Sequence, residues 1–175
     1  MKKTVLTFGI LSGLAISFLM YLGMPSGENP NYEAGEIYGY LTMIISLSFI
    51  FIGIKMLRDK YQSGKITFGR AFLAGFYISL ISSLMYAVSW EIYLSVSKVD
   101  FMEKYAEAQI QKMKTDGATE AAINEKTASM NSMKEYYKNP VLRFGITVFE
   151  MLPVGILISL ISAGILRKKE ILPAT

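Results

Sequence analysis

The stretch FGITVFEMLPVGILISLISAGIL, residues 144–166, decides the fold class of this chain. It contains one charged side chain, Glu150, and is followed by the basic run Arg167, Lys168 and Lys169. An α-helix rises about 1.5 Å per residue, so about 20 apolar residues cross the hydrocarbon core of a bilayer, which is about 30 Å thick. We therefore predict a transmembrane helix at residues 144–166.

Three more stretches have the same character, at about residues 4–24, 37–54 and 68–96. Of the 175 residues, 52% are hydrophobic and 18% are charged, whereas roughly a quarter are charged in a typical soluble domain. The first stretch could instead be a cleaved signal peptide, but its apolar run exceeds the usual length of about 7–15 residues. We predict one all-α integral membrane domain over residues 1–175, a four-span transmembrane helical bundle.

The segment of residues 98–140 is polar and separates the third and fourth spans. Asp100 with Glu103 is typical of a helix N-terminus, residues 116–117 of a turn, and Thr119 can cap a second helix. We predict an extramembrane helical hairpin, about 98–140, that extends spans three and four beyond the bilayer. The alternative is a Met-rich surface that docks a partner or lies on the lipid surface.

Lysine and arginine are unevenly distributed among the connections, and their distribution predicts the orientation in the membrane. The connection between the first two spans has none. Ten of the 18 lie at the N-terminus, between spans two and three, and at the C-terminus: Lys2, Lys3, Lys55, Arg58, Lys60, Lys65, Arg70, Arg167, Lys168 and Lys169. Long, charge-balanced segments contribute little to orientation. We therefore expect both termini in the cytoplasm and the hairpin on the other side.

Histidine and cysteine do not occur in the sequence. Thiol nucleophiles, imidazole bases, disulfides and the usual zinc and haem ligands are thereby excluded. No HExxH, GxSxG or P-loop pattern occurs either. The net charge of +4 arises near the span ends, which is typical of membrane retention and contact with anionic lipid. We expect no enzymatic activity, no cofactor and no nucleic-acid partner.

Small residues recur at intervals of four within three of the predicted spans, and in lipid such residues mark close contacts between helices. They are Gly9, Gly13 and Ser17 in the first span, Ala71, Gly75, Ser79, Ser83 and Ala87 in the third, and Gly155, Ser159 and Ala163 in the fourth. We predict that they pack the spans of one chain against each other in the bilayer. A homo-oligomer interface is the alternative.

Two carboxylates, Glu91 and Glu150, lie within predicted spans. A carboxylate at the centre of a membrane helix costs roughly 2.5–3.5 kcal/mol on insertion scales, which makes such residues candidates for a functional site. Both lie near the outer boundary, where they could share a proton, bind a cation, or pair with Lys98 and Arg143. Pro153 is expected to kink the fourth span near Glu150. The simpler interpretation is that each carboxylate only reaches water or a nearby cation.

Two runs of the sequence resemble the DUF4199 family of small integral membrane proteins, found mainly in Bacteroidota. They are KYQSGKITFGRAFLAGF at residues 60–76 and FGITVFEMLPVGILISLISAGILRKK at residues 144–169, which contains an E-x-x-P-V-G element. The resemblance covers nearly the whole chain, with its four spans and its charged connection. It implies a protein of the bacterial inner membrane without an established biochemical role, so it transfers no catalytic residue.

Two functional classes follow from these observations. The first is a structural or accessory membrane protein whose outer hairpin binds a protein partner, which the lack of catalytic residues favours. The alternative is a small proton- or cation-coupled transporter that uses Glu150 and Glu91. Four spans are few for a transporter protomer, so this alternative requires an oligomer.

Overall fold

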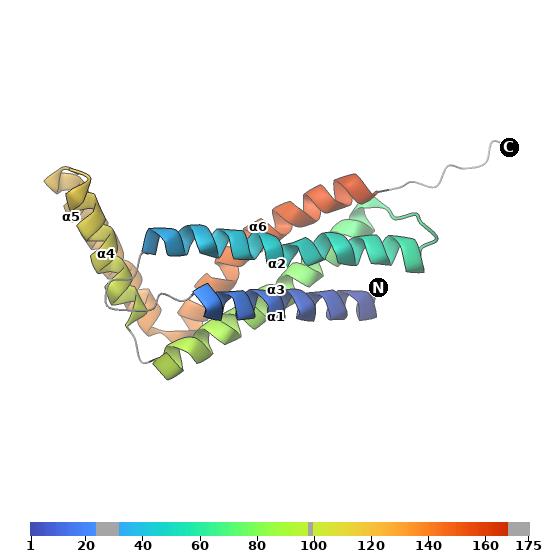
Figure 1. Cartoon of the computed structure of the whole chain (residues 1–175), viewed down its shortest axis with the longest axis horizontal. Helices are drawn as coiled ribbons and strands as arrows, with labels where there is room; N and C mark the ends of the chain where they lie inside the picture. Colours follow the sequence, from blue (N-terminus) through green and yellow to red (C-terminus); the bar gives the residue numbers. More distant parts are fainter. Residues whose placement is uncertain (24–31, 98–99, 168–175) are drawn as a thin grey trace.

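The computed structural model describes residues 1–23, 32–97 and 100–167 (Figure 1). These residues form six helices and no β-sheet. The helices are α1 (Lys2–Gly23), α2 (Tyr32–Tyr61), α3 (Phe68–Ser97), α4 (Phe101–Thr115), α5 (Glu120–Lys138) and α6 (Pro140–Leu166). The all-α fold class is confirmed. The features expected at Lys98, Lys168 and Lys169 lie outside the described residues.

Four of the helices, α1, α2, α3 and α6, are long and apolar enough to cross a membrane. The chain is therefore a multi-pass membrane protein. Helix α2 continues to Tyr61, well past the end of its apolar run at residue 54, and α6 begins at Pro140, ahead of its apolar run. Charged residues end an apolar run without ending a helix, because lysine and arginine are good helix formers. Their long side chains can also reach the polar boundary of the bilayer from within it.

Helix α3 contacts each of the other three long helices, α1, α2 and α6. Its contacts with α1 and α6 depend on glycines, because a methyl group at these positions would overlap a neighbouring side chain. A Cβ on Gly9 would lie 2.8 Å from Ile81 Cβ, and one on Gly13 2.8 Å from Met85 Cβ. Between α3 and α6 the small residues interleave in pairs, Gly75 with Ser159 and Gly155 with Ser79. These contacts lie within one chain, and Ser79, Ser83 and Ser159 are fully buried.

Serine hydroxyls join the long helices in the interior. Ser12 Oγ of α1 donates to the carbonyl of Ser46 in α2 at 2.8 Å and lies 3.0 Å from Ser82 Oγ of α3. Nearer the hairpin, Ser89 Oγ lies 2.8 Å from Ser17 Oγ. Hydrogen bonds of this kind add to van der Waals packing when no water surrounds the helices. The interior is thus held by small residues and a few hydroxyls.

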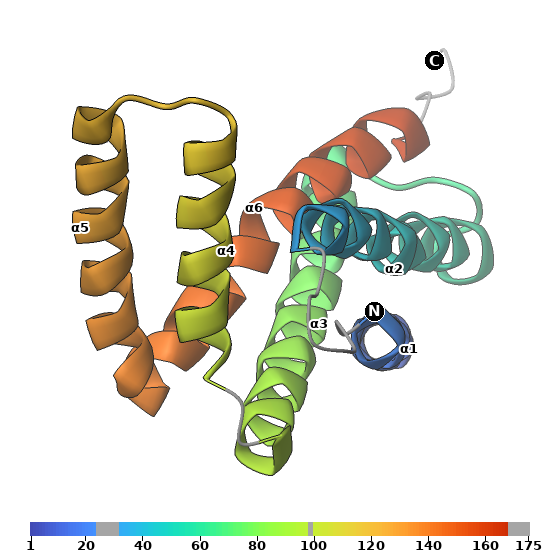
Figure 2. The same ribbon diagram turned by 60° about the vertical axis from the view of Figure 1, so that its left-hand side comes forward.

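The hairpin of α4 and α5 begins at the capping residues that its sequence indicates. Asp100 accepts a hydrogen bond from Glu103 N at 2.9 Å, and Thr119 accepts one from Ala122 N at 3.3 Å. The hairpin is steeply inclined to the long helices (Figure 1), so it does not continue spans three and four as we expected from the sequence. Figure 2 shows α4 between α5 and the bundle. A polar link from α4 to α2, described below, joins the inclined hairpin to the bundle.

We predict that Gly155→Ala destabilises the bundle by about 1–3 kcal/mol, the usual cost of overpacking. The added Cβ would lie 2.6 Å from Ser79 Cβ, so α3 and α6 must move apart. Gly164→Ala in the same helix is the control, since a Cβ there meets nothing within 4 Å. Thermal unfolding in detergent measures both variants. Equal melting temperatures for the two would contradict the interleaved packing.

Candidate functional site

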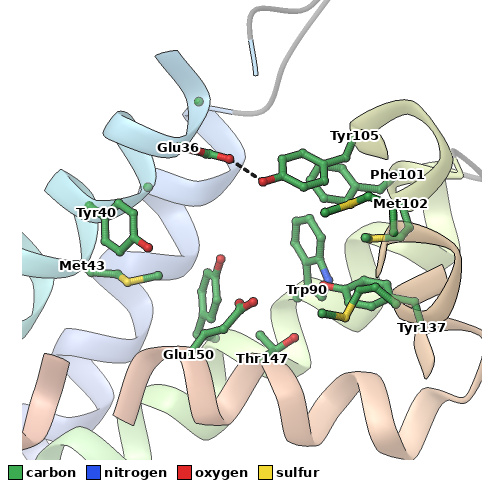
Figure 3. A pocket seen from close by; sticks show the side chains of 15 residues that line it. Glu36, Tyr40, Met43, Trp90, Phe101, Met102, Tyr105, Tyr137, Thr147 and Glu150 are labelled. Atoms are coloured by element: carbon green, nitrogen blue, oxygen red, sulfur yellow. Dashed lines mark hydrogen bonds between the residues drawn. The ribbon is translucent and has the colours of Figure 1, made fainter. Parts of the chain in front are cut away.

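A cavity of about 580 Å³ lies beneath the hairpin, between α2, α3, α4, α5 and α6 (Figure 3). This volume is within the range of about 300–1,000 Å³ that is usual for small-molecule sites. Aromatic and methionine side chains make up most of the wall. Its lining residues are Gly35, Glu36, Gly39, Tyr40, Met43, Tyr86, Trp90, Phe101, Met102, Tyr105, Met130, Met133, Tyr137, Thr147 and Glu150.

Glu150 lies on the floor of this cavity and comes from α6 (Figure 3). Its side chain is exposed toward the cavity. Among the described residues, it has no hydrogen-bond or salt-bridge partner. Its charge contributes to the raised pKa of Tyr137 on α5. The cavity therefore holds an acidic group that no described side chain neutralises.

Glu36 of α2 is the second carboxylate of the cavity, and it binds the hairpin. Tyr105 Oη of α4 donates a hydrogen bond to Glu36 Oε1, and Gln109 Nε2 donates another at 3.1 Å. Burial and the Glu36 hydrogen bond raise the pKa of Tyr105, so its hydroxyl stays protonated as the donor. This link holds α4 against the beginning of α2, and Figure 3 shows it at the rim.

Trp90 of α3 and Tyr137 of α5 form one wall of the cavity. Trp90 is 6% exposed, and its ring meets Phe101 edge to face with ring centroids 4.9 Å apart. The Tyr137 hydroxyl lies near the indole nitrogen, but Trp90 Nε1 is buried without a hydrogen-bond partner in the described residues. Burial, with a smaller effect of the Glu150 charge, raises the pKa of Tyr137 to about 12. Tyr137 is therefore a neutral phenol at physiological pH.

Glu91 and Arg143 lie outside the cavity lining and form an ion pair between α3 and α6. Arg143 donates from Nε to Glu91 Oε1 at 2.7 Å and from Nη2 to Glu91 Oε2 at 2.5 Å. A third bond, from Nη1, reaches the carbonyl of Tyr137 in α5 at 3.0 Å. The side chains of Arg143 and Glu91 are 19% and 25% exposed, so the pair is largely withdrawn from solvent.

The structure thus gives the two predicted carboxylates different surroundings. Glu91 is bound by Arg143, Glu150 lines the cavity, and no described hydrogen bond joins the two. Lys98, the other expected cation, lies outside the described residues. Helix α6 continues through Pro153, where the missing N–H leaves one backbone carbonyl without its helical partner.

Sequence reasoning missed Glu36 and Tyr105 as members of this site. By sequence, Glu36 is only an acid that precedes the second predicted span, and Tyr105 is only one residue of the polar segment 98–140. Trp90 was noticeable as an aromatic residue near the end of a span, a position typical of the membrane interface. Glu36 and Tyr105 join the site only because the hairpin docks on α2. Their contact links residues far apart in the sequence, so no local pattern indicates it.

The cavity carries two carboxylates, Glu36 and Glu150, amid mostly aromatic and methionine side chains. No group of three or more acidic side chains capable of holding a metal occurs in residues 1–23, 32–97 and 100–167. Ca²⁺ needs six to eight oxygen ligands and Mg²⁺ six. Two carboxylates amid aromatic rings instead provide negative charge and polarisable apolar surface.

A family model described as "Protein of unknown function (DUF4199)" matches residues 7–168 of the chain. Comparison with curated proteins and with solved structures found no match. The family match covers α1 from residue 7 onward, the other three long helices and the hairpin, so it includes every lining residue of the cavity. It carries no statement about a ligand or an activity.

We predict that Glu91→Gln lowers the free energy of unfolding by about 1–3 kcal/mol, because it leaves Arg143 without its charged acceptor. Chemical unfolding of the purified protein in detergent measures the change. The control is Glu135→Gln, which removes an exposed pair with Lys138 whose side chains are 70% and 71% exposed. Exposed pairs contribute about 0–1 kcal/mol. An effect of Glu91→Gln no larger than that of Glu135→Gln would show that the pair does not hold α3 to α6.

Proposed function

The chain belongs to the DUF4199 family, and from its geometry we propose that it is an accessory protein of the bacterial cytoplasmic membrane that binds a protein partner through its hairpin. The distribution of lysine and arginine supports cytoplasmic termini and an extracytoplasmic hairpin. In this orientation the cavity opens near the outer surface of the membrane.

The observation that carries this proposal is the solvent exposure of α5. None of its residues is buried, whereas α4 buries Met102 and Ala106. Figure 2 shows α4 lying between α5 and most of the bundle, although the near side of α5 contacts α6 and helps to line the cavity; its opposite face meets no other described part of the chain. Outside the cavity lining, that helix exposes Tyr136, which is 55% exposed. Tyrosine is enriched in protein interfaces.

The sequence contains no recognisable catalytic motif, which also supports an accessory role. The alternative function, an oligomeric proton- or cation-coupled transporter, is favoured by one observation, the uncompensated Glu150 in the cavity. Toward the other end of the bundle, however, the interior is filled by fully buried Ile50, Ile78 and Met151. A passage across the membrane would have to open through these side chains.

We predict that a cysteine introduced by Ser132→Cys on α5 reacts with a membrane-impermeant maleimide in spheroplasts. The natural chain has no cysteine, so the label reports one position. A photoactivatable crosslinker attached there should join the chain to a discrete protein. Adding Tyr136→Ala should reduce this product, because it removes an exposed anchor from the same helix.

The control is Ser63→Cys, in the exposed turn between α2 and α3. It should react only after the cells are lysed, and should give no crosslink to the same protein. Labelling of position 63 in intact spheroplasts would overturn the orientation. A product of Ser132→Cys that Tyr136→Ala leaves unchanged would overturn partner binding by this face.

A further inference from the structure

The cavity beneath the hairpin has a charge composition that selects for cations. Two of its lining residues, Glu36 and Glu150, are acidic, and none of the described lining residues is basic. Glu36 is engaged by Tyr105 and Gln109 at the rim, while Glu150 has no hydrogen-bond or ion-pair partner among residues 1–23, 32–97 and 100–167. A carboxylate in surroundings of reduced polarity is stabilised by a nearby positive charge.

The remaining wall is made of groups that favour an organic cation over a metal ion. Six aromatic residues line the cavity: Tyr40, Tyr86, Trp90, Phe101, Tyr105 and Tyr137. The faces of such rings attract ammonium groups, and clusters of them recognise alkylated ammonium ions. Because Met43, Met130 and Met133 also line it, the cavity presents apolar surface to the carbon atoms of a ligand.

A second observation points to a ligand independently of the carboxylate. Trp90 is only 6% exposed, and its Nε1–H makes no well-aligned hydrogen bond in the described residues, although the Tyr137 hydroxyl lies beside it. An unpaired buried donor costs about 1–3 kcal/mol. Trp90 lines the cavity, so water or an oxygen atom of a ligand can satisfy this donor.

We propose that this cavity binds an alkylammonium group, with the positive charge beside Glu150 and the attached carbon atoms against the aromatic rings. The ammonium group can belong to a soluble amine or to the headgroup of a lipid, because both carry the same chemistry. This inference goes beyond partner recognition, since it uses the cavity and not the uncovered face of α5. The cavity can bind an ammonium group whether or not α5 binds a protein partner.

Trp90 provides the readout, because it is the only tryptophan of the chain. Titrating the purified protein with tetramethylammonium chloride should change its fluorescence with a saturable dependence on concentration, and should raise its melting temperature. Sodium chloride at the same ionic strength should have neither effect. Choline should bind, and its neutral analogue 3,3-dimethylbutan-1-ol should not. Equal binding of choline and this analogue would overturn the proposal.

Glu150→Gln tests the residue that the proposal depends on. It should weaken tetramethylammonium binding by about tenfold or more, because the paired charge is lost. Glu125→Gln is the matched control: it removes one exposed carboxylate of α5 that does not line the cavity, and should bind as the natural protein does. Binding by Glu150→Gln that equals the control overturns the proposal. If Glu150→Gln fails to fold, the comparison of choline with its neutral analogue still decides, since it needs no variant.

Nanodiscs distinguish the two sources of the ammonium group. In discs of phosphatidylglycerol alone, tetramethylammonium should bind as in detergent. If phosphatidylethanolamine in the disc suppresses this binding, the headgroup occupies the cavity. If it does not, a soluble amine is the ligand. Absence of binding in the phosphatidylglycerol discs would contradict the proposal, whatever the outcome of the partner crosslinking.

Discussion

One guanidinium group, that of Arg143, joins three helices at the hairpin end of the bundle. It binds Glu91 of α3 through two hydrogen bonds and the Tyr137 carbonyl of α5 through a third, while it belongs itself to α6. Near the membrane boundary such a fork is more stable than a single contact, because its planar donors match the carboxylate. The position of the cavity depends on it, since Trp90 adjoins Glu91 and Tyr137 supplies the carbonyl.

The rest of the bundle keeps these groups in place through the close approach of its helices at small residues. Gly155 and Ser79 bring α6 and α3 together so closely that no larger residue fits. Beyond them, toward the hairpin, Thr147 and Glu150 of α6 and Tyr86 and Trp90 of α3 line a common cavity. The same helices are thus tightly packed in their middle and leave room at one end. The cavity occupies the space that this arrangement leaves at the hairpin end.

The sequence was sufficient to predict the four long helices, because uninterrupted apolar length is a local property. The helix starts at Asp100 and Thr119 were also predictable, since capping needs only a few neighbouring residues. The site was predictable in part. Glu150 was singled out by the cost of a carboxylate in lipid, but Glu36 and the inclination of the hairpin were not. They depend on contacts between helices far apart in sequence, for which a single sequence gives no periodic signal.

The hairpin is docked on α2 through Glu36 and so covers the cavity that contains Glu150. The most direct measurement is to introduce Glu36→Cys and Gln109→Cys into the cysteine-free chain, in membranes, and to add a short bismethanethiosulfonate crosslinker. The natural side chains lie 3.1 Å apart at Gln109 Nε2 and Glu36 Oε1. We expect an intramolecular crosslink between positions 36 and 109, detected by mass spectrometry, and none between Glu36→Cys and Glu120→Cys at the far end of the hairpin. Modification of both cysteines at 36 and 109 without any link between them would contradict it.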